Sequence, residues 1–325
     1  MNTIIQKTLL VTCLSAVAGS QSAWAQDTYP QKEIRFITAF SAGSASDIVA
    51  RLLAERLQKN LGQTVIVENK PGASGQIAAD YVKNAKPDGY TIMLATNTTH
   101  SANPYLFKSL RYDPVKDFTP LAQICNFPFV LAVSGTLPIS SVQELIDHKK
   151  KDGAALSYAY GNSTGQIAAA AFDKAVGINA TAVPYKSSPQ AMTDIIGGRA
   201  SFMFADLASA GAYIESGKLK ILGVTTKKRS VLAPKLPTIA ETINQPTFDL
   251  AAWVGIFGPA DMPKPIVKRL SDELVKITSS DDMQQRLIKM GAEPTAAPAE
   301  KFGPFVVDQL KVWGEKVKEA GIEPQ

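Results

Sequence analysis

The sequence predicts an α/β protein in which helices flank mostly parallel β-sheets. Short runs rich in β-branched and aromatic residues alternate with amphipathic stretches through most of the chain. This alternation is typical of strand–helix–strand units with parallel strands. Turn-forming residues separate the runs, for example Asn-Lys-Pro-Gly at 69–72 and Pro-Asp-Gly at 87–89, and they support the expected boundaries.

The expected elements follow from these two patterns. Strands are expected at residues 33–40, 64–68, 90–96, 127–134, 156–160, 181–185, 200–204, 219–225 and 253–258. Helices are expected at residues 48–61, 75–84, 141–151, 165–176 and 189–197, and the remainder to 321 is expected to be mainly helical. The first helix has the apolar spacing of one helical face, at Ile48, Leu52, Leu53 and Leu57. Ser140 or Ser141 is expected to cap the helix that contains Glu144.

The first 25 residues are expected to be a secretory signal peptide. Lys7 supplies a positive charge, an apolar run follows at 9–18, and Ala-Trp-Ala at 23–25 matches a cleavage pattern. A membrane anchor is the alternative, but the apolar run is about half of the roughly 20 residues that a spanning helix needs. The sequence before Cys13 is a poor match for lipoprotein processing. We therefore expect export and cleavage after Ala25.

The remaining residues, 26–325, suit two domains of ordinary size. No low-complexity linker is visible, which favours two short crossings near residues 123–127 and 225–237 over one flexible joint. The expected first lobe is therefore discontinuous, with residues 26–125 and 227–325, and the second lobe is 126–226. The C-terminal helices belong to the first lobe or lie across both.

Charge and metal-ligating residues exclude several classes of function. The formal net charge is +5, and the basic runs at 149–151 and 227–229 lack interleaved aromatic residues, so no nucleic-acid partner is expected. Cys125 is the one cysteine after the expected cleavage, which rules out an intramolecular disulfide. Two histidines, His100 and His148, are too few for a dedicated His/Cys metal site. No nucleotide-binding glycine motif is present, and we expect no cofactor and no metal.

Five loops lead from an expected strand toward a polar segment or helix start. Such loops bind ligands in parallel sheets, because helix N-termini present unpaired N–H groups that favour anions. In the first loop, the candidate ligand-binding residues are Phe40, Ser41, Ala42, Gly43, Ser44 and Ser46. In the second, they are Asn97, Thr98 and His100. The alternatives are a serine-rich helix cap for the first loop and a self-satisfied turn for the second.

The third loop contains a G-x-S-x-G pattern at 161–165, which resembles the nucleophile elbow of serine hydrolases. A hydrolase of that order needs a histidine after the serine, and none follows Ser163. A Ser-Lys arrangement stays open without positive support. The simpler interpretation is a helix start, at which Ser163 and Thr164 cap the helix and can bind an oxyanion together with Asn162.

The fourth and fifth loops add two further candidates. Ser187 precedes a helix that has Pro189 in its first turn. Asp206 follows a strand, where its carboxylate can accept from a ligand amine, hydroxyl or water, or cap the next helix. Phe40 and Phe204 either flank the body of a ligand or belong to the core. Because these loops are rich in donors and lack a general-base histidine, they favour binding over catalysis.

The chain resembles the Bug-type periplasmic receptors, which are the solute-binding components of tripartite tricarboxylate transporters. Segments along the whole chain carry this resemblance, namely Tyr29-Pro30-x-Lys32-x-Ile34, residues 40–51, 61–73, 87–91, 112–118, 183–186, 217–219 and 236–238, and Trp313. The resemblance implies a two-lobed periplasmic-binding-protein fold of the Venus-flytrap type. It also implies periplasmic localisation, a small carboxylate ligand, permease subunits as partners, and a monomer without enzymatic activity.

Three departures from the family's usual motifs bear on which ligand the protein binds. The usual Pro-Phe-x-Pro-Gly-Gly is Ala-Phe-Ser-Ala-Gly-Ser at 39–44, Tyr-Lys-Gly becomes Tyr-Lys-Ser at 185–187, and Met-Phe-Asp is lengthened at 203–206. The first two changes add hydroxyl groups. We therefore expect an aromatic mono- or di-acid, of which terephthalate is an example, or an aliphatic C4–C6 di-acid. The rival functions are a sensing subunit for a signalling partner and an exported hydrolase that uses Ser163.

Overall fold

The computed structural model describes residues 29–152, 155–230 and 233–325. The expected signal peptide and its cleavage site after Ala25 lie outside the described residues. The chain divides into two units, residues 1–31 and residues 32–325. Of the first unit, residues 29–31 alone are described. The fold and the site below belong to the second unit.

The first lobe contains a parallel three-stranded arrangement in the order β2-β1-β3. The strands are β1 (Ile34–Thr38), β2 (Val65–Asn69) and β3 (Thr91–Thr96). The helices and short turns that connect or cover them are α2 (Ala45–Leu61), η1 (Ala73–Gly75), α3 (Gln76–Lys83), the π-helix η2 (Thr98–Ala102), α4 (Asn103–Leu106), α10 (Lys264–Thr278) and α11 (Asp281–Lys289).

The second lobe contains another parallel arrangement, in the order β7-β5-β6. Its strands are β5 (Ser157–Tyr160), β6 (Thr181–Pro184), β7 (Phe202–Asp206) and β8 (Leu219–Val224). Its helices are α5 (Val142–Asp152), α6 (Ser163–Val176), α7 (Ser188–Ile196) and α8 (Leu207–Glu215). The short helix α9 (Ile239–Thr242) packs against α5, although the expected boundary at residue 226 places it in the first lobe. Ser141 Oγ accepts from Glu144 N at the start of α5, so the expected serine cap is confirmed.

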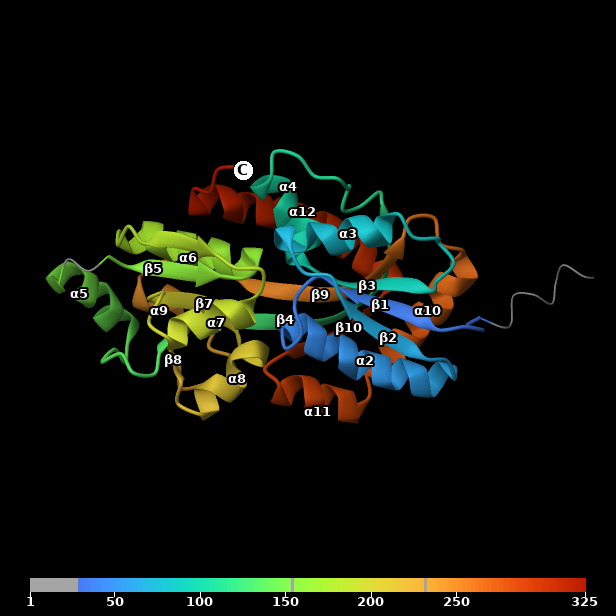
Figure 1. The fold of residues 1–325 in the computed structure, drawn as a ribbon, viewed down its shortest axis with the longest axis horizontal. Helices are drawn as coiled ribbons and strands as arrows, with labels where there is room; N and C mark the ends of the chain where they lie inside the picture. Colours follow the sequence, from blue (N-terminus) through green and yellow to red (C-terminus); the bar gives the residue numbers. More distant parts are fainter. Residues whose placement is uncertain (1–28, 153–154, 231–232) are drawn as a thin grey trace, which may run out of the picture. The chain divides into compact units, whose positions relative to one another are not determined.

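Two long strands, β4 (Phe118–Ser134) and β9 (Ala251–Pro259), run between the lobes (Figure 1). The first part of β4 pairs antiparallel with β9 and with β10 (Glu293–Pro298), and the second part pairs with β7 and β8. The α/β fold and its two-lobed type are confirmed. The parallel pairing holds within β1–β3 and β5–β7, whereas the strands that join the lobes pair antiparallel.

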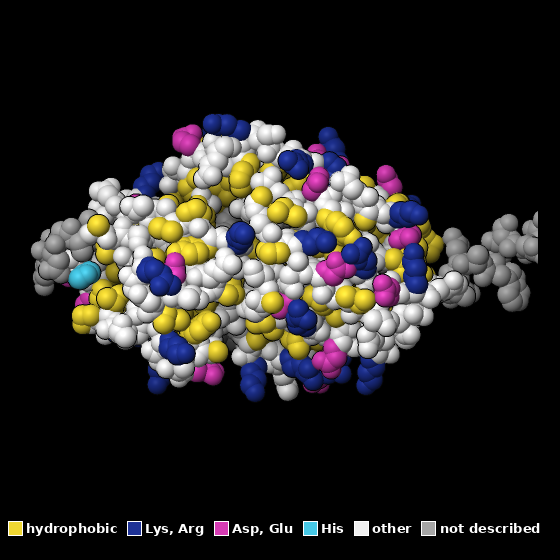
Figure 2. All heavy atoms as spheres, in the orientation of Figure 1, with side chains coloured by type: hydrophobic (Ala, Val, Ile, Leu, Met, Phe, Trp, Pro, Cys, Tyr) yellow, Lys and Arg dark blue, Asp and Glu magenta, His cyan; other side chains and the backbone are white. Residues whose placement is uncertain are grey.

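The last helix, α12 (Ala299–Ala320), packs against elements of both lobes, because it contacts η2, β4 and α6. Its Trp313 is buried. The expected helical C-terminal region is therefore confirmed, except that β10 interrupts it. In the described part of the chain, no helix is both long enough and apolar enough to cross a membrane. Figure 2 shows positive and negative side chains interspersed over one face, with no extended basic stripe.

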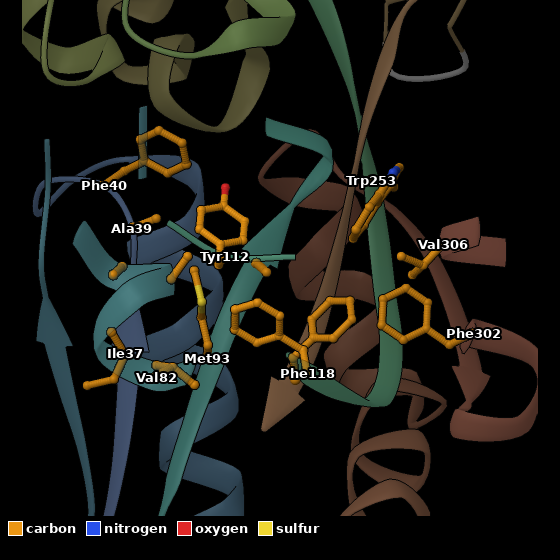
Figure 3. Packing of buried hydrophobic residues seen from close by; sticks show 14 residues of the cluster. Ile37, Ala39, Phe40, Val82, Met93, Tyr112, Phe118, Trp253, Phe302 and Val306 are labelled. Carbon is orange, nitrogen blue, oxygen red and sulfur yellow. The ribbon is translucent and has the colours of Figure 1, made fainter. Parts of the chain in front are cut away.

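A cluster of buried aromatic side chains forms the core of the first lobe (Figure 3). Trp253 and Phe257 of β9 pack there against Phe302 of α12, with ring centroids 5.7 and 5.0 Å from the Phe302 ring. Figure 3 shows Phe40 at the end of the cluster that lies nearest the second lobe. The first lobe therefore supplies a rigid apolar base to the region between the lobes.

Candidate ligand-binding cleft

A small cavity lies between the lobes, with a volume of about 30 Å³. Both lobes line it, and so do the strands that join them. The lining residues are Phe40, Ser44, Ala45, Ser46, Thr96, Asn97, Thr98, Phe127, Phe129, Asn162, Thr164, Ser188, Asp206 and Ala252. Ligand pockets usually measure roughly 300–1,000 Å³. The cavity has room for water alone in this conformation, and a larger ligand requires the lobes to move apart.

The first loop is held by Asp47, which is buried at the start of α2. Its carboxylate accepts from Gly43 N at 3.0 Å, from Asn69 Nδ2 at 2.9 Å and from the Arg51 guanidinium. Burial acts to raise its pKa, but these hydrogen bonds, above all that of Arg51, hold the pKa of Asp47 below its usual value. Asp47 thus braces the loop, while Ser44 caps α2 by accepting from Asp47 N.

The second loop folds as the π-helix η2 and then α4. Asn97 and Thr98 line the cavity, but the His100 ring lies in the aromatic core, stacked on Phe257 at a centroid distance of 4.1 Å. Burial lowers the pKa of His100 to about 3, so its imidazole is neutral at ordinary pH. His100 does not line the cavity. We therefore leave it out of the proposed site.

The third loop leads into α6, and the N-cap of this helix is Asn162 and not Ser163 or Thr164. Asn162 Oδ1 accepts from Gly165 N at 2.8 Å, which corrects the expectation that the two hydroxyls cap this helix. The reason is geometric, because Ser163 and Thr164 already stand inside the first turn. Their hydroxyls are directed across the cleft instead. Ser163 Oγ donates to Thr98 Oγ1 at 2.8 Å.

Packing explains the glycines of the G-x-S-x-G pattern. A Cβ atom at Gly161 would lie 2.1 Å from the backbone carbon of Ser187, and one at Gly165 would lie 2.8 Å from the Phe204 carbonyl oxygen. The pattern therefore reflects close approach of the third loop to the fourth loop and to β7.

The helices α7 and α8 complete the rim of the cleft. Ser187 precedes α7 but makes no side-chain cap, and its Oγ donates to Ser41 Oγ at 3.0 Å in the first lobe. Asp206 caps α8, with Oδ1 accepting from Ser209 N and Ser209 Oγ, both at 2.7 Å. Ser209 Oγ in turn accepts from Ala45 N at 3.0 Å. Both helix starts are thus tied to the first loop.

Five hydrogen bonds, which we call the cross-lobe hydrogen bonds, join the cleft residues of the first lobe to those of the second. Their donor and acceptor pairs are Ser187 Oγ to Ser41 Oγ, Asn97 Nδ2 to Thr164 Oγ1, Ser163 Oγ and Ser163 N to Thr98 Oγ1, and Ala45 N to Ser209 Oγ. All of these bonds join strand-to-helix loops or the first turns of the helices that follow them. The described structure is therefore a closed conformation in which the two sets of loops touch.

The N-termini of α2, α6, α7 and α8 all meet at this cavity, through Ser44, Asn162, Ser188 and Asp206. Each helix start leaves N–H groups that the helix itself cannot pair, and carries about half a positive charge. Four such starts around one site favour an anion without any cationic side chain. The arrangement can hold a carboxylate, and the Ser163 hydroxyl donates to Thr98 Oγ1 and not to a carboxylate or imidazole of the described residues.

The cavity brings together eight of the candidate residues, namely Phe40, Ser44, Ser46, Asn97, Thr98, Asn162, Thr164 and Asp206. Ser41, Ser163 and Ser187 lie next to it in cross-lobe hydrogen bonds, while Ala42 and Gly43 are exposed. Phe204 belongs to the core, where its ring contacts Phe172 and Phe202. Sequence reasoning missed Phe127, Phe129 and Ala252, whereas Ala45, Thr96 and Ser188 belong to the loops that it singled out.

The fold and the cleft define the class of this protein as a two-lobed solute-binding protein. Residues 49–322 match the TctC family, described as tripartite tricarboxylate transporter family receptors, and the chain belongs to this family. A UPF0065 protein of Bordetella bronchiseptica is 32% identical over 320 residues, which cover 98% of this chain and 95% of that protein.

Solved structures of similar proteins agree with this assignment. Rpa4515 of R. palustris with adipate is 33% identical, covers 91% of this chain and 100% of its own, and has a TM-score of 0.88. The periplasmic binding protein BugD has the same identity and coverage and a TM-score of 0.86. MatC of Rhodopseudomonas palustris with bound malate is 28% identical over 89% of this chain and 100% of its own, with a TM-score of 0.82.

Proposed function

We propose that this protein captures a small carboxylate between its two lobes in the periplasm and delivers it to the permease subunits of a tripartite transporter. The observation that carries the proposal is the convergence of four helix N-termini on one cavity. Membership of the TctC family supports it. So do the adipate and malate bound to two similar proteins.

Ligand entry requires hinge opening, because the cavity of about 30 Å³ is too small for such acids. We propose that the hinge lies where β4 passes between the lobes and where the chain returns along β9, with Thr225 beside both crossings. Thr225 is fully buried, and its Oγ1 accepts from Phe129 N at 3.1 Å and donates to Leu250 O at 2.5 Å. This residue ties both crossings together, so opening rotates the lobes while the crossings stay paired.

We propose that ligand oxygens replace the cross-lobe hydrogen bonds on binding. Each such bond contributes only about 0.5–1.5 kcal/mol net, since water competes for both partners. A carboxylate accepts several hydrogen bonds at once, and bonds to an ionised acceptor are stronger. The hydroxyl and amide groups of Ser163, Thr164 and Asn97 are therefore suited to exchange their partners for the ligand.

The body of the ligand is expected to be apolar. Phe40, Phe127 and Phe129 line the cavity together with two alanines, and none of these side chains offers a hydrogen bond. Apolar burial contributes about 25 cal/mol per Å². Both an aromatic acid and an aliphatic C4–C6 di-acid satisfy this lining.

A thermal-shift screen over aliphatic and aromatic carboxylates tests the proposal. A ligand at a hundredfold excess over its Kd stabilises the folded state by about 2.7 kcal/mol, so a true ligand produces a clear rise in Tm. We expect at least one carboxylate to do so. If no carboxylate raises the Tm while a neutral or cationic compound does, the proposal fails.

A further inference from the structure

The cleft contains one ionisable side chain among the described residues that line it, and this side chain is an acid. Asp206 is 4% exposed, at the end of β7. Its neighbours in the lining are hydroxyl, amide and apolar side chains. Burial raises the pKa of Asp206 above its usual value, although its bonds from Ser209 oppose this effect. In its ionised form, Asp206 would place a buried charge of the same sign beside a simple carboxylate ligand.

A second acceptor faces the same cavity. Asn97 is fully buried and lines the cavity, and its Nδ2 donates to Thr164 Oγ1 at 2.8 Å. Its Oδ1 is buried and has no hydrogen-bond partner among the described residues. A buried acceptor without a donor is unfavourable, and a donor brought by a ligand would satisfy it.

We infer that the ligand carries, besides its carboxylate, a hydroxyl or ammonium group that donates to Asp206 and Asn97. The inference rests on the proposed capture of a carboxylate and narrows its substrate class to hydroxy or amino acids. The helix N-termini hold the carboxylate, and Asp206 and Asn97 accept hydrogen bonds from the ligand's hydroxyl or ammonium group. An acid that lacks a donor leaves Asn97 Oδ1 unpaired and gives Asp206 no hydrogen bond beyond those from Ser209, so the cleft discriminates against it.

Matched pairs of acids test this inference on the wild-type protein by calorimetric titration. The pairs are malate with succinate, aspartate with succinate, and 4-hydroxybenzoate with benzoate, so that each pair differs by one donor group. In the pair whose carbon skeleton fits, we expect the donor-bearing acid to bind about tenfold more tightly or better. Equal affinity within every pair that binds would overturn the inference and leave carboxylate capture standing. Binding by no acid, either in these pairs or in the thermal-shift screen of carboxylates, would overturn both.

The variant Asp206→Asn identifies the acceptor. Asparagine keeps an oxygen that accepts from Ser209 N, so the start of α8 is preserved. Loss of the charge weakens the hydrogen bond from the ligand's donor group. We therefore expect the ratio of the two affinities in the matched pair to fall by about threefold or more. The control Asp272→Asn removes an acid on the exposed side of α10 and should leave the preference unchanged. An unchanged preference in Asp206→Asn, or an equal gain in affinity for both acids, would overturn the inference.

Discussion

Ser187 Oγ donates a hydrogen bond to Ser41 Oγ at 3.0 Å, and this bond joins two loops that are 146 residues apart. Ser187 stands immediately before α7, where its hydroxyl would ordinarily cap the helix. The hydroxyl instead crosses to the other lobe. The bond therefore stabilises the closed conformation and not the helix that follows it.

Removing this bond should open the ligand-free protein. Ser41→Ala and Ser187→Ala each remove a net contribution of about 1 kcal/mol, which changes the ratio of closed to open molecules about fivefold. Small-angle X-ray scattering should show a larger average radius of gyration in each variant. The double variant should resemble either single variant, since both remove the same bond. Unchanged scattering in all three variants would show that the bond does not stabilise closure.

Replacing Thr225 by valine should destabilise the whole fold. The change keeps the shape of the side chain but leaves the buried Phe129 N and Leu250 O without this partner. We expect a loss of about 1–3 kcal/mol in the free energy of unfolding, measured with urea. Thr226→Val is the matched control, because the next residue is partly exposed, and it should change the free energy by less than about 0.5 kcal/mol. Equal effects of the two variants would contradict the role given to Thr225.

A methyl group at Gly161 should disturb the cleft. In Gly161→Ala the added Cβ would lie 2.1 Å from Ser187 C and 2.2 Å from Ser188 N, and both are backbone atoms that can move only with their loop. We expect a lower Tm and weaker binding of the carboxylate found by screening. Gly211→Ala in α8 is the control, since its Cβ has open space, and alanine should stabilise the helix by up to about 1 kcal/mol. Normal stability and binding in Gly161→Ala would refute the close approach of the two loops.

Ionisation of Asp206 should lower the free energy of unfolding as the pH rises. Burial raises the pKa of its carboxyl in the folded state, so the protonated form is favoured there. The stabilisation is present below the unfolded pKa of about 3.9 and is lost as the pH rises through the folded value. Asp206→Asn cannot ionise, and its free energy of unfolding relative to wild type should increase between pH 4 and pH 7. Urea titrations at both pH values check this, and a decrease would contradict it.

Local patterns predicted most of the α/β fold, but they missed strands that tertiary pairing creates. The first part of β4 contains Pro120, where the register with β9 shifts, and proline cannot donate to a strand ladder. β10 contains Pro294 and Pro298 and pairs with β4 at an irregular register. Low strand propensity hid both segments. Their pairing partners lie far away in sequence, and a local pattern carries no information about them.

The site was predictable where it depends on strand-to-helix loops. Asn162 and Asp206 follow parallel strands, and the topology alone brings them to one cleft. Phe127, Phe129 and Ala252 lie on the strands that join the lobes, so a search of loops could not find them. His100 lies in the π-helix η2 with its ring stacked on Phe257 in the core, and the local sequence carries no signal for this uncommon type of helix.

The most direct test of the central claim is a calorimetric comparison of the best carboxylate ligand with its uncharged carboxamide. The two compounds have nearly the same shape and differ in the anionic group that the helix N-termini are proposed to hold. We predict binding of one carboxylate per protein chain, with the carboxamide at least about tenfold weaker. Equal affinity for the two compounds would contradict capture of an anion at the cleft.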